Sequence, residues 1–308
     1  MASTLDTRDE SRSTFSQPPR ELPLLFNPGS GHGDCEALAA TVRDRVPGAR
    51  TEILADGDDL LVRLDRLADG SAAFGISGGD GSVAAAARVA LDHAATLAVV
   101  PGGTFNHFAT AIGIDSAERA IAAIISGTTR EVDAGIVDGH VFLNVVGLGV
   151  WPDFVRVRDQ LTERFGKRLA GLAATARVLR RRRRVGVTID GVCTEAWLVF
   201  IGNCQYSGDS FDPLKRDDLA DGTFDVRVVS AGRGSLLRAA RALLRHGTEL
   251  GLSHGYLRYA TGQVTIHTAR DHEPIVFDGE VIKASGRDVV VTKHAHQLRV
   301  FAPAVSGP

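Results

Sequence analysis

Three glycine-rich segments carry the residues best suited to binding a phosphate group. They read Asn27-Pro-Gly-Ser-Gly31, Gly78-Gly-Asp-Gly-Ser82 and Pro101-Gly-Gly-Thr-Phe-Asn106. Glycine allows backbone N–H groups to approach a phosphate closely, and the N-terminus of a following helix adds partial positive charge. Each segment also has a hydroxyl or carboxamide side chain. We therefore predict a phosphate-binding site formed by three turns.

The spacing of these glycines matches neither the P-loop, G-x-x-x-x-G-K-[ST], nor a G-x-G-x-x-G at the first turn. One such turn alone is more often a tight connection between a strand and a helix, whereas three in succession favour phosphate binding. Asp80 stands in the second turn, where a carboxylate facing phosphates makes sense if Mg²⁺ lies between them. The alternative is that Asp80 caps the helix expected to begin near Val83.

The elements around these turns alternate in a regular order. A short apolar run, a glycine turn and a helical segment follow one another three times, which predicts a parallel sheet with helices on its faces. Ligands of such α/β sheets bind beyond the carboxyl ends of the strands, where all three turns lie. We expect strands at Leu22–Phe26, Ala72–Ile76 and Leu97–Val100, and helices at Leu38–Val46, Val83–Asp92 and Ala109–Ile112.

After about Asp133 the pattern changes to short β-rich runs separated by turn residues, some of which alternate apolar and polar residues as antiparallel strands do. We expect a disordered leader over 1–20, an α/β domain over 21–133 to which about 288–303 returns, and a β-sandwich-like domain over 134–287. The runs are Val141–Val146, Val185–Ile189, Trp197–Ile201, Phe224–Val229, Gln263–His267, Pro274–Phe277 and Val289–Phe301, with helices expected at Arg168–Arg182 and Ser235–Glu249.

Composition excludes several classes of protein. The 308 residues are 44% hydrophobic and carry a formal net charge of −2, so no global basic field attracts nucleic acid. Three cysteines, far apart, argue against a disulfide framework or structural zinc site and fit a reducing cytoplasm. No run reaches the roughly 18 apolar residues of a membrane span, and the polar N-terminus is no secretory signal. We therefore expect a cytoplasmic protein whose contact with any membrane would be peripheral.

The glycine segments together strongly resemble the nucleotide-binding motifs of the diacylglycerol kinase catalytic-domain family, which includes bacterial soluble lipid kinases, sphingosine kinases and ceramide kinases. GGDG alone would be less specific, because NAD kinases and phosphofructokinases carry it too. The resemblance covers about residues 22–303 and implies an NAD-kinase/phosphofructokinase-like α/β domain followed by a β-sandwich, with ATP and lipid in the cleft between them. Later landmarks agree: Val132-Asp-Ala-Gly135, Gly202-Asn203, Asp218–Val226 and Phe277-Asp-Gly-Glu280.

This resemblance implies roles for individual residues. Asp278 would be the general base that takes a proton from a lipid hydroxyl as it attacks the γ-phosphoryl group, and Glu280 would assist it or contact the metal. From the residues alone, Asp278-Gly279 is also a strong hairpin-turn signal. The residues implied in ATP binding are Asn27, Pro28, Gly29, Ser30, Gly31, Gly78, Gly79, Asp80, Gly81, Ser82, Gly103, Thr104 and Asn106.

The resemblance also implies oxygen ligands for Mg²⁺. Asp218, Asp221 and the backbone carbonyl of Thr223 match the structural metal site of the family, although a solvated acidic loop is the ordinary alternative. Asp80 and Asp133 would belong to a second Mg²⁺ network. The family usually has an aspartate in that network directly after the motif asparagine, and this chain has His107 there. An imidazole is a poorer Mg²⁺ partner than a carboxylate, which leaves room for altered or absent activity.

Two smaller features concern the match to the family and contact with lipid. The threonine usual in the second strand region of the family is missing, since Ile53–Asp56 occupy that stretch, while Ser82 replaces a threonine conservatively. The five arginines Arg180–Arg184 form either a solvated helix end or a patch for anionic lipid headgroups.

The function implied is an ATP- and Mg²⁺-dependent lipid kinase, with diacylglycerol as the default acceptor and phosphatidic acid as product. The partner would be a lipid substrate at a membrane surface, which implies a cytoplasmic protein in peripheral contact with the inner membrane surface. A homodimer is compatible with this. The alternatives are a non-catalytic lipid- or nucleotide-binding relative, which His107 motivates, and an NAD-kinase-like phosphotransferase.

Overall fold

The structure, a computed structural model, describes residues 13–15, 19–30, 34–153, 184–189, 191–207, 216, 218–231 and 256–304. The chain divides into two compact units. The first comprises Met1–Ala134, Asp218–Ala220 and Ala295–Pro308, and the second comprises Gly135–Asp217 and Asp221–His294. The two expected helices at Arg168–Arg182 and Ser235–Glu249, and the arginines 180–183, lie outside the described residues.

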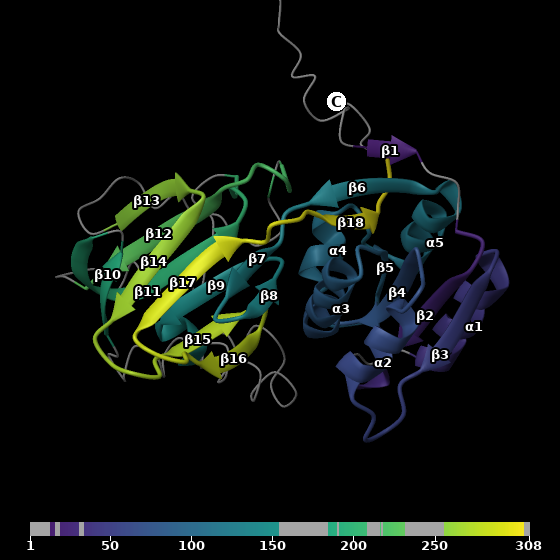
Figure 1. Cartoon of the computed structure of the whole chain (residues 1–308), viewed down its shortest axis with the longest axis horizontal. Coiled ribbons are helices and arrows are strands. Elements are labelled where there is room, and N and C mark those ends of the chain that lie inside the picture. The colour runs from purple at the N-terminus through teal and green to yellow at the C-terminus, as the bar shows by residue number, and fades with distance from the viewer. Residues whose placement is uncertain are drawn as a thin grey trace, which may run out of the picture. The chain divides into compact units, whose positions relative to one another are not determined.

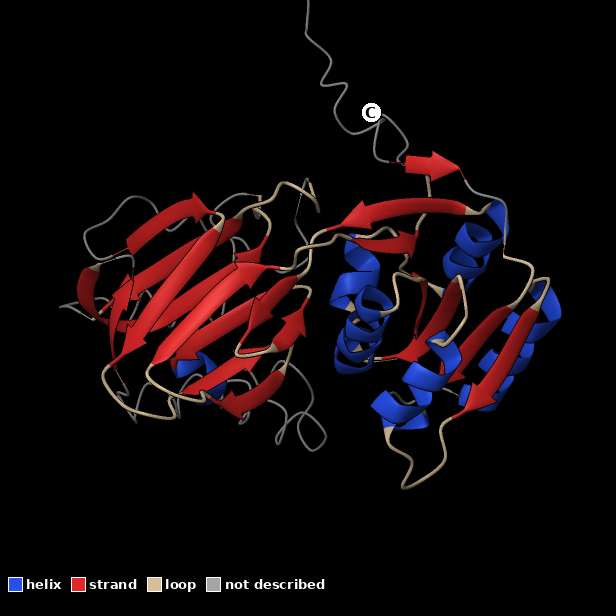
Figure 2. Cartoon of the chain, viewed as in Figure 1, coloured by secondary structure: helices blue, strands red, loops and turns tan. Residues whose placement is uncertain are grey.

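The first unit has a seven-stranded sheet in the order β1-β6-β18-β5-β4-β2-β3. The strands β3, β2, β4, β5 and β18 run parallel, and β6 runs antiparallel to β18. Helices pack around this sheet, as the blue ribbons of Figure 2 show. The strands are β1 (Ser13–Phe15), β2 (Leu22–Phe26), β3 (Ala49–Ile53), β4 (Ala73–Gly78), β5 (Thr96–Pro101), β6 (Thr128–Val132) and β18 (Leu298–Phe301).

Three helices of this unit follow a residue whose side chain caps them. The Asp34 carboxylate accepts a hydrogen bond from the N–H of Ala37, Asp59 caps the helix that begins at Leu60, and Ser116 caps the helix that begins at Ala117. The helices are α1 (Cys35–Arg45), α2 (Leu60–Ala68), α3 (Asp80–Asp92), α4 (His107–Ala111) and α5 (Ala117–Ser126). The expected α/β class with a parallel sheet is confirmed.

The structure adds four elements to the expected first domain and corrects one expectation. Strand β3 and helix α2 lie between the first two expected strands, and α5 and β6 follow the third expected helix. Strand β3 is an edge strand whose side chains are mostly exposed, so its sequence lacks an apolar run. The expectation of a disordered leader over 1–20 is wrong at 13–15, because β1 pairs antiparallel with β6. Ser, Thr and Phe suit a strand, and the pairing covers the open edge of β6.

The second unit is built from antiparallel strands, as expected, and they form one 11-stranded sheet (Figure 1). Inward-facing apolar side chains from most of its strands share a single core, with Phe142, Phe224 and Phe277 among them. The strands are β7 (Gly135–Val137), β8 (His140–Phe142), β9 (Val145–Gly149), β10 (Val185–Ile189), β11 (Val192–Asn203), β12 (Phe224–Ser230), β13 (Tyr256–Thr261), β14 (Gln263–Thr268), β15 (Pro274–Phe277), β16 (Glu280–Lys283) and β17 (Asp288–Lys293).

Two expected strands are each divided in two. The run Val141–Val146 breaks at Leu143 and Asn144, because the N–H groups there bind a side chain instead of a neighbouring strand. The tail Val289–Phe301 becomes β17, which pairs with β14 and β7 in the second unit, and β18, which pairs with β5 and β6 in the first. The return to the first unit therefore begins at Ala295 and not near 288.

Candidate functional site

The second and third glycine turns contact each other through their backbones. They follow β4 and β5, which are neighbouring parallel strands with Gly78 opposite Pro101. The N–H of Gly102 donates to the carbonyl of Gly78 at 3.1 Å. A Cβ added to Gly103 would lie 2.4 Å from the Cα of Gly79, a distance that no side chain tolerates. Glycine is therefore required for the two turns to meet.

Asn106 closes the third turn instead of projecting from it. Its backbone is left-handed, with φ of 52°. Its Oδ1 accepts from the N–H of Gly103 at 2.9 Å, and its Nδ2 donates to the carbonyl of Gly103 at 2.8 Å. The exposed tip of the loop consists of Thr104 and Phe105. Asn106 thus shapes a loop whose tip is open to a ligand.

The first turn is tied to the second by Asn27. Its Nδ2 donates to the Oγ of Ser82 at 2.9 Å, and its backbone N–H donates to the carbonyl of Ser77 at 2.8 Å. Its Oδ1 also accepts from the N–H of Gly29 at 3.0 Å, which shapes the short 3-10 turn at Pro28–Ser30. The structure therefore brings together all three turns that the sequence predicts; residues 31–33 lie outside the described part of the chain.

Asp80 is a helix cap, but of a different helix from the one expected. Helix α3 begins at Asp80 itself, and the carboxylate reaches across to the start of α4. There it accepts from the N–H of His107 at 3.2 Å and from the N–H of Phe108 at 3.1 Å. A carboxylate oxygen can accept more than one bond, so each retains capacity for a cation. The His107 ring stacks on the Phe105 ring, with centroids 5.4 Å apart.

Asp133 and Asp218, the other expected metal ligands of the first unit, each have hydrogen-bond partners. Asp133 is buried, accepts from the Nε2 of Gln297 at 2.9 Å, and donates its N–H to the carbonyl of Leu219 at 2.7 Å. Asp218 accepts from the N–H of Ala220 at 2.8 Å. These contacts attach the 218–220 segment to the first unit.

The other two expected metal ligands belong to the second unit. The Asp221 carboxylate accepts from the N–H of Thr223 at 2.7 Å and from the N–H of Gln205 at 2.8 Å. The Thr223 carbonyl accepts from the N–H of Cys204 at 3.0 Å. The loop is thus held by hydrogen bonds within its own unit, and its oxygen atoms remain the type that Mg²⁺ prefers.

Asp278 occupies the two-residue loop of a β-hairpin, as its Asp-Gly pair indicates. Asp278 and Gly279 have φ of 45° and 94°, and Phe277 pairs with Glu280 across the turn. The Asp278 carboxylate accepts three backbone hydrogen bonds: from Leu143 at 2.6 Å, from Asn144 at 2.9 Å and from Val145 at 3.0 Å. The hairpin therefore presents a carboxylate in a fixed orientation, while Glu280 is exposed.

A buried polar network around this segment was not predicted from the sequence. The Tyr206 hydroxyl donates to the carbonyl of Asn144 at 2.9 Å, and burial raises the pKa of this phenol. Two guanidinium groups, of Arg227 and Arg258, bind the buried carboxylate of Asp225. The one available signal was the pair of charged residues, Asp225 and Arg227, in an otherwise apolar strand.

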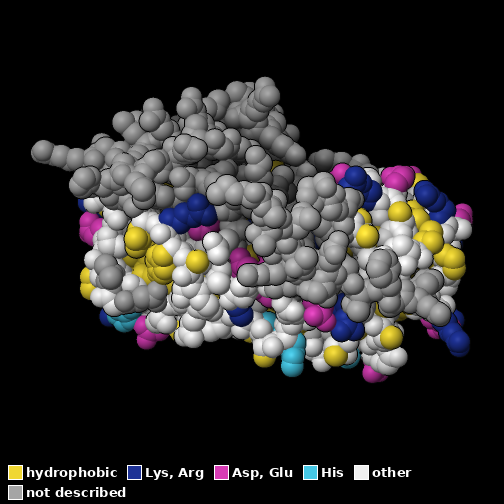
Figure 3. Space-filling model, turned by 90° about the horizontal axis from the view of Figure 1, so that it is seen from above, with side chains coloured by type: hydrophobic (Ala, Val, Ile, Leu, Met, Phe, Trp, Pro, Cys, Tyr) yellow, Lys and Arg dark blue, Asp and Glu magenta, His cyan; other side chains and the backbone are white. Residues whose placement is uncertain are grey.

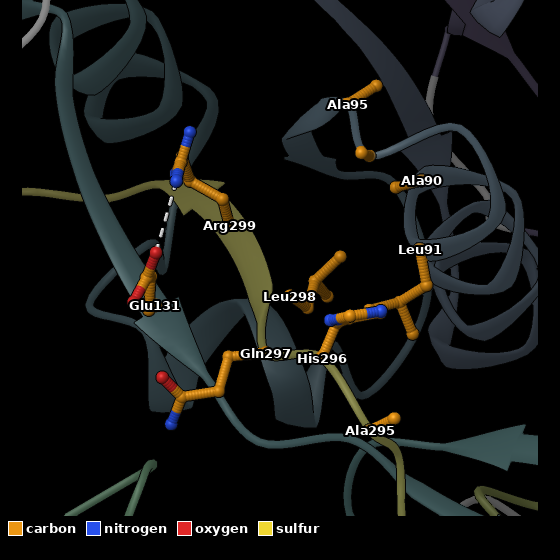
Figure 4. A pocket seen from close by; sticks show the side chains of 10 residues that line it. Ala90, Leu91, Ala95, Glu131, Ala295, His296, Gln297, Leu298 and Arg299 are labelled. Carbon is orange, nitrogen blue, oxygen red and sulfur yellow. Dashed lines mark hydrogen bonds and ion pairs between the residues drawn. The ribbon is translucent and has the colours of Figure 1, made fainter.

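A separate cavity lies at the opposite end of α3 from Asp80 (Figure 4). Its volume is about 460 Å³, and it is bordered by an ion pair between Arg299 and Glu131. None of the residues expected to bind ATP or metal lines it.

Comparison with known proteins gives consistent results. Residues 21–137 match the diacylglycerol kinase catalytic domain. A probable lipid kinase YegS-like from Pseudomonas aeruginosa is 27% identical over 295 residues, covering 92% of this chain and 95% of that protein. A diacylglycerol kinase from Bacillus subtilis is 30% identical over 180 residues, 55% of this chain and 59% of that protein. The crystal structure of a putative diacylglycerol kinase from Bacillus anthracis superposes with a TM-score of 0.72 at 20% identity, covering 94% of this chain and all of that one (100%).

Proposed function

Because this chain belongs to the diacylglycerol kinase-like family of lipid kinases, we propose that it transfers the γ-phosphoryl group of ATP, with Mg²⁺, to the hydroxyl of diacylglycerol to give phosphatidic acid. The observation that carries this proposal is the contact between the Gly79 and Gly103 turns at the carboxyl ends of two neighbouring parallel strands. Such an edge is where α/β sheets bind their ligands.

Phosphate binding follows from the chemistry of these turns. Gly79 precedes α3, a 13-residue helix whose first N–H groups carry partial positive charge. The Gly79 Cα fills the space of a side chain at Gly103, and the Gly103 N–H already donates to Asn106. The N–H groups that we propose for phosphate oxygens are therefore those at the start of α3. The exposed hydroxyl of Thr104 adds a donor at the loop tip. The three glycine turns together form what we call the phosphate cradle. Asp80 is the one charged residue in these turns, which suits a ligand that arrives with its own cation.

Each of the two units contains oxygen donors with the chemistry that Mg²⁺ requires. Asp80 supplies carboxylate oxygens, the hard ligands that Mg²⁺ takes. In the second unit, Asp221 and Thr223 offer oxygen donors of the same type. Bound Mg²⁺ would neutralise charge on the phosphates during transfer.

Asp278 is proposed to orient the acceptor hydroxyl and receive its proton. Three backbone N–H groups hold its carboxylate, so it cannot rotate freely. Phosphoryl transfer passes through a loose transition state in which positioning contributes more than the strength of the base. A carboxylate with a fixed orientation is suited to that task.

The proposed partner is a lipid surface and not a nucleic acid. No helix in the described residues is long and apolar enough to cross a membrane. The formal net charge of −2 gives no global basic field for a phosphodiester backbone. Where described side chains are visible in Figure 3, Lys and Arg groups lie apart from one another, with Asp or Glu beside several of them.

The test is phosphorylation of lipid in mixed micelles that contain diacylglycerol, with labelled ATP and Mg²⁺. We expect labelled phosphatidic acid from the wild type, no product in EDTA, and a loss of about a hundredfold or more in Asp278→Asn. Asp271→Asn, which changes an exposed acid of the same unit, should leave the rate unchanged. Asparagine keeps one oxygen, which can accept from the N–H groups of Asn144 and Val145 but leaves that of Leu143 without its acceptor. Thermal unfolding checks that the variant is folded.

The alternative of a non-catalytic relative rests on His107, whose backbone Asp80 caps. ATP binding without product over a panel of lipid alcohols would favour it and overturn the kinase proposal. Recovery of product in His107→Asp would then identify the missing carboxylate as the cause. Absence of ATP binding would overturn the phosphate cradle itself.

A further inference from the structure

Asp278 is held by one short segment, and that segment is itself held from its opposite side. The N–H groups of Asn144 and Val145 donate to the Oδ1 of Asp278. These N–H groups belong to the peptide planes whose carbonyls are those of Leu143 and Asn144. In a trans peptide the N–H and C=O bonds point in opposite directions. Whatever binds the two carbonyls therefore determines where the two N–H groups point.

Arg216 makes the charged contact on the carbonyl side. Its Nη1 donates to the Leu143 carbonyl at 2.7 Å, and its Nη2 donates to the Oδ1 of the Asn144 side chain at 2.9 Å. Nη1 also reaches the carbonyl of Asn203 at 3.1 Å. Among the described residues, the hydrogen-bond acceptors of this guanidinium are neutral oxygens and not carboxylates.

Two neutral residues complete the carbonyl side. The Nδ2 of Asn203 donates to the Leu143 carbonyl at 3.1 Å. The Asn144 carbonyl accepts from the Tyr206 hydroxyl at 2.9 Å and from the Asn203 N–H at 2.8 Å. Lys293 fixes Asn203 in turn, with its Nζ 2.7 Å from the Asn203 Oδ1. Among the described residues that bind the two carbonyls directly, only Arg216 is a cation.

A cation on a peptide carbonyl strengthens the N–H of the same peptide as a donor. Hydrogen bonds from a charged donor are roughly twice as strong as neutral ones, and linked hydrogen bonds polarise one another at low dielectric. Arg216 thus acts on Asp278 without touching it, through the peptide group between Leu143 and Asn144. The same guanidinium also donates to the Asn144 side chain, so it holds the peptide group between Leu143 and Asn144 by two hydrogen bonds.

We propose that Arg216 is a positioning residue for Asp278, which it orients through the peptide groups of 143–145. This inference rests on the proposed function, in which Asp278 receives the proton of the acceptor hydroxyl. A merely structural role would be to cover the Tyr206 ring, above which the guanidinium carbon lies at 5.3 Å from the centroid. The two roles predict different outcomes when Arg216 and Asp278 are substituted together. Only a positioning role makes the effect of Arg216 on the rate depend on Asp278.

The test is a double-mutant cycle on the full-length protein with Arg216→Met, Asp278→Asn and the double variant, assayed with diacylglycerol micelles. A misplaced catalytic group costs roughly a hundredfold. We expect Arg216→Met to lower kcat by about ten- to a hundredfold, with KM for ATP unchanged. The double variant should be no slower than Asp278→Asn alone. Arg216→Lys keeps a cation but cannot bind the Leu143 carbonyl and the Asn144 side chain in the same way. Its kcat should lie between those of the wild type and Arg216→Met.

Arg287→Met is the matched control, because Arg287 lies on the same unit in an exposed ion pair with Asp271. It should leave kcat unchanged. Losses that multiply in the double variant, or a change confined to KM, would show that Arg216 acts independently of Asp278 and overturn the proposal. Full activity in a folded Arg216→Met protein would do the same.

A second measurement separates this inference from the proposed function. Amide hydrogen exchange at Asn144 and Val145 should be faster in both Arg216→Met and Asp278→Asn, and unchanged in Arg287→Met. If the wild type phosphorylates no lipid, the proposed function fails, while exchange still decides whether Arg216 orders the segment. Unchanged exchange in Arg216→Met overturns the positioning role whatever the activity.

Discussion

The carboxylate of Asp80, at the first residue of α3, accepts the backbone N–H of His107, at the first residue of α4, at 3.2 Å. One side chain therefore joins the helices that follow two neighbouring strands, and it does so at the rim of the glycine turns. The contact gives Asp80 a structural role in addition to the Mg²⁺ role proposed above.

Asp80→Ala should lower both stability and ATP affinity. Loss of a helix cap costs about 1 kcal/mol, and the third turn loses its anchor at the same time. Asp59→Ala removes a comparable cap from α2. It should cost a similar amount in chemical unfolding but leave the affinity for Mg-ATP, measured by calorimetry, unchanged. If Asp80→Ala and Asp59→Ala change the affinity for Mg-ATP equally, Asp80 does not take part in binding it.

Gly103→Ala should abolish ATP binding because its Cβ would lie 2.4 Å from the Cα of Gly79. The neighbour is backbone, so the turns must separate, at a cost of about 1 to 3 kcal/mol for overpacking. Gly286→Ala places its Cβ in open space and is the matched control. Nucleotide titration followed by thermal shift checks both, and unimpaired ATP binding in Gly103→Ala would show that the contact between turns is dispensable.

Arg227→Met should destabilise the second unit by up to about 3 kcal/mol, because Asp225 then loses the guanidinium that is buried with it and keeps only the contact with the partly exposed Arg258. Asp225 and Arg227 are almost fully buried, with relative exposures of 1% and 0%. The exposed arginine of the Arg287–Asp271 pair provides the comparison, since Arg287→Met should cost less than about 1 kcal/mol. Urea unfolding measures the loss of stability in both variants. Similar losses would contradict the conclusion that the buried ion pair contributes more to stability than the exposed one.

The stability of the protein should fall at alkaline pH through Tyr206. Burial raises the pKa of this phenol above its ordinary value of 10.0. Below pH 10 both states keep the proton and the contribution is complete. Above it the unfolded state ionises first, so the free energy of unfolding falls by up to about 1.4 kcal/mol per pH unit.

Tyr206→Phe isolates this effect from the other tyrosines. It should cost about 1 kcal/mol at pH 7, through loss of the hydrogen bond to the Asn144 carbonyl. The difference in unfolding free energy between wild type and variant should shrink as the pH rises above 10. A difference that stays constant from pH 8 to 11 would mean that the phenol ionises as easily in the folded state.

Much of the candidate site follows from local sequence. The glycine turns are visible because each lies between an apolar strand and a helix, and Asp278-Gly279 is visible because a two-residue hairpin loop needs positive φ at both positions. These signals depend on neighbours in the chain. β3 escaped prediction because an edge strand with exposed side chains lacks an apolar run.

The tertiary structure alone decided what these residues contact. Asp80 binds N–H groups 27 and 28 positions away, and Asp278 interrupts a strand that lies 133 to 135 positions earlier. Arg216 reaches Leu143 over 73 positions. The sequence determined where backbone conformation permits a turn, because φ and ψ preferences are local. Which N–H group a carboxylate finds depends on how strands from distant parts of the chain pair, and a single sequence carries no local signal for that pairing.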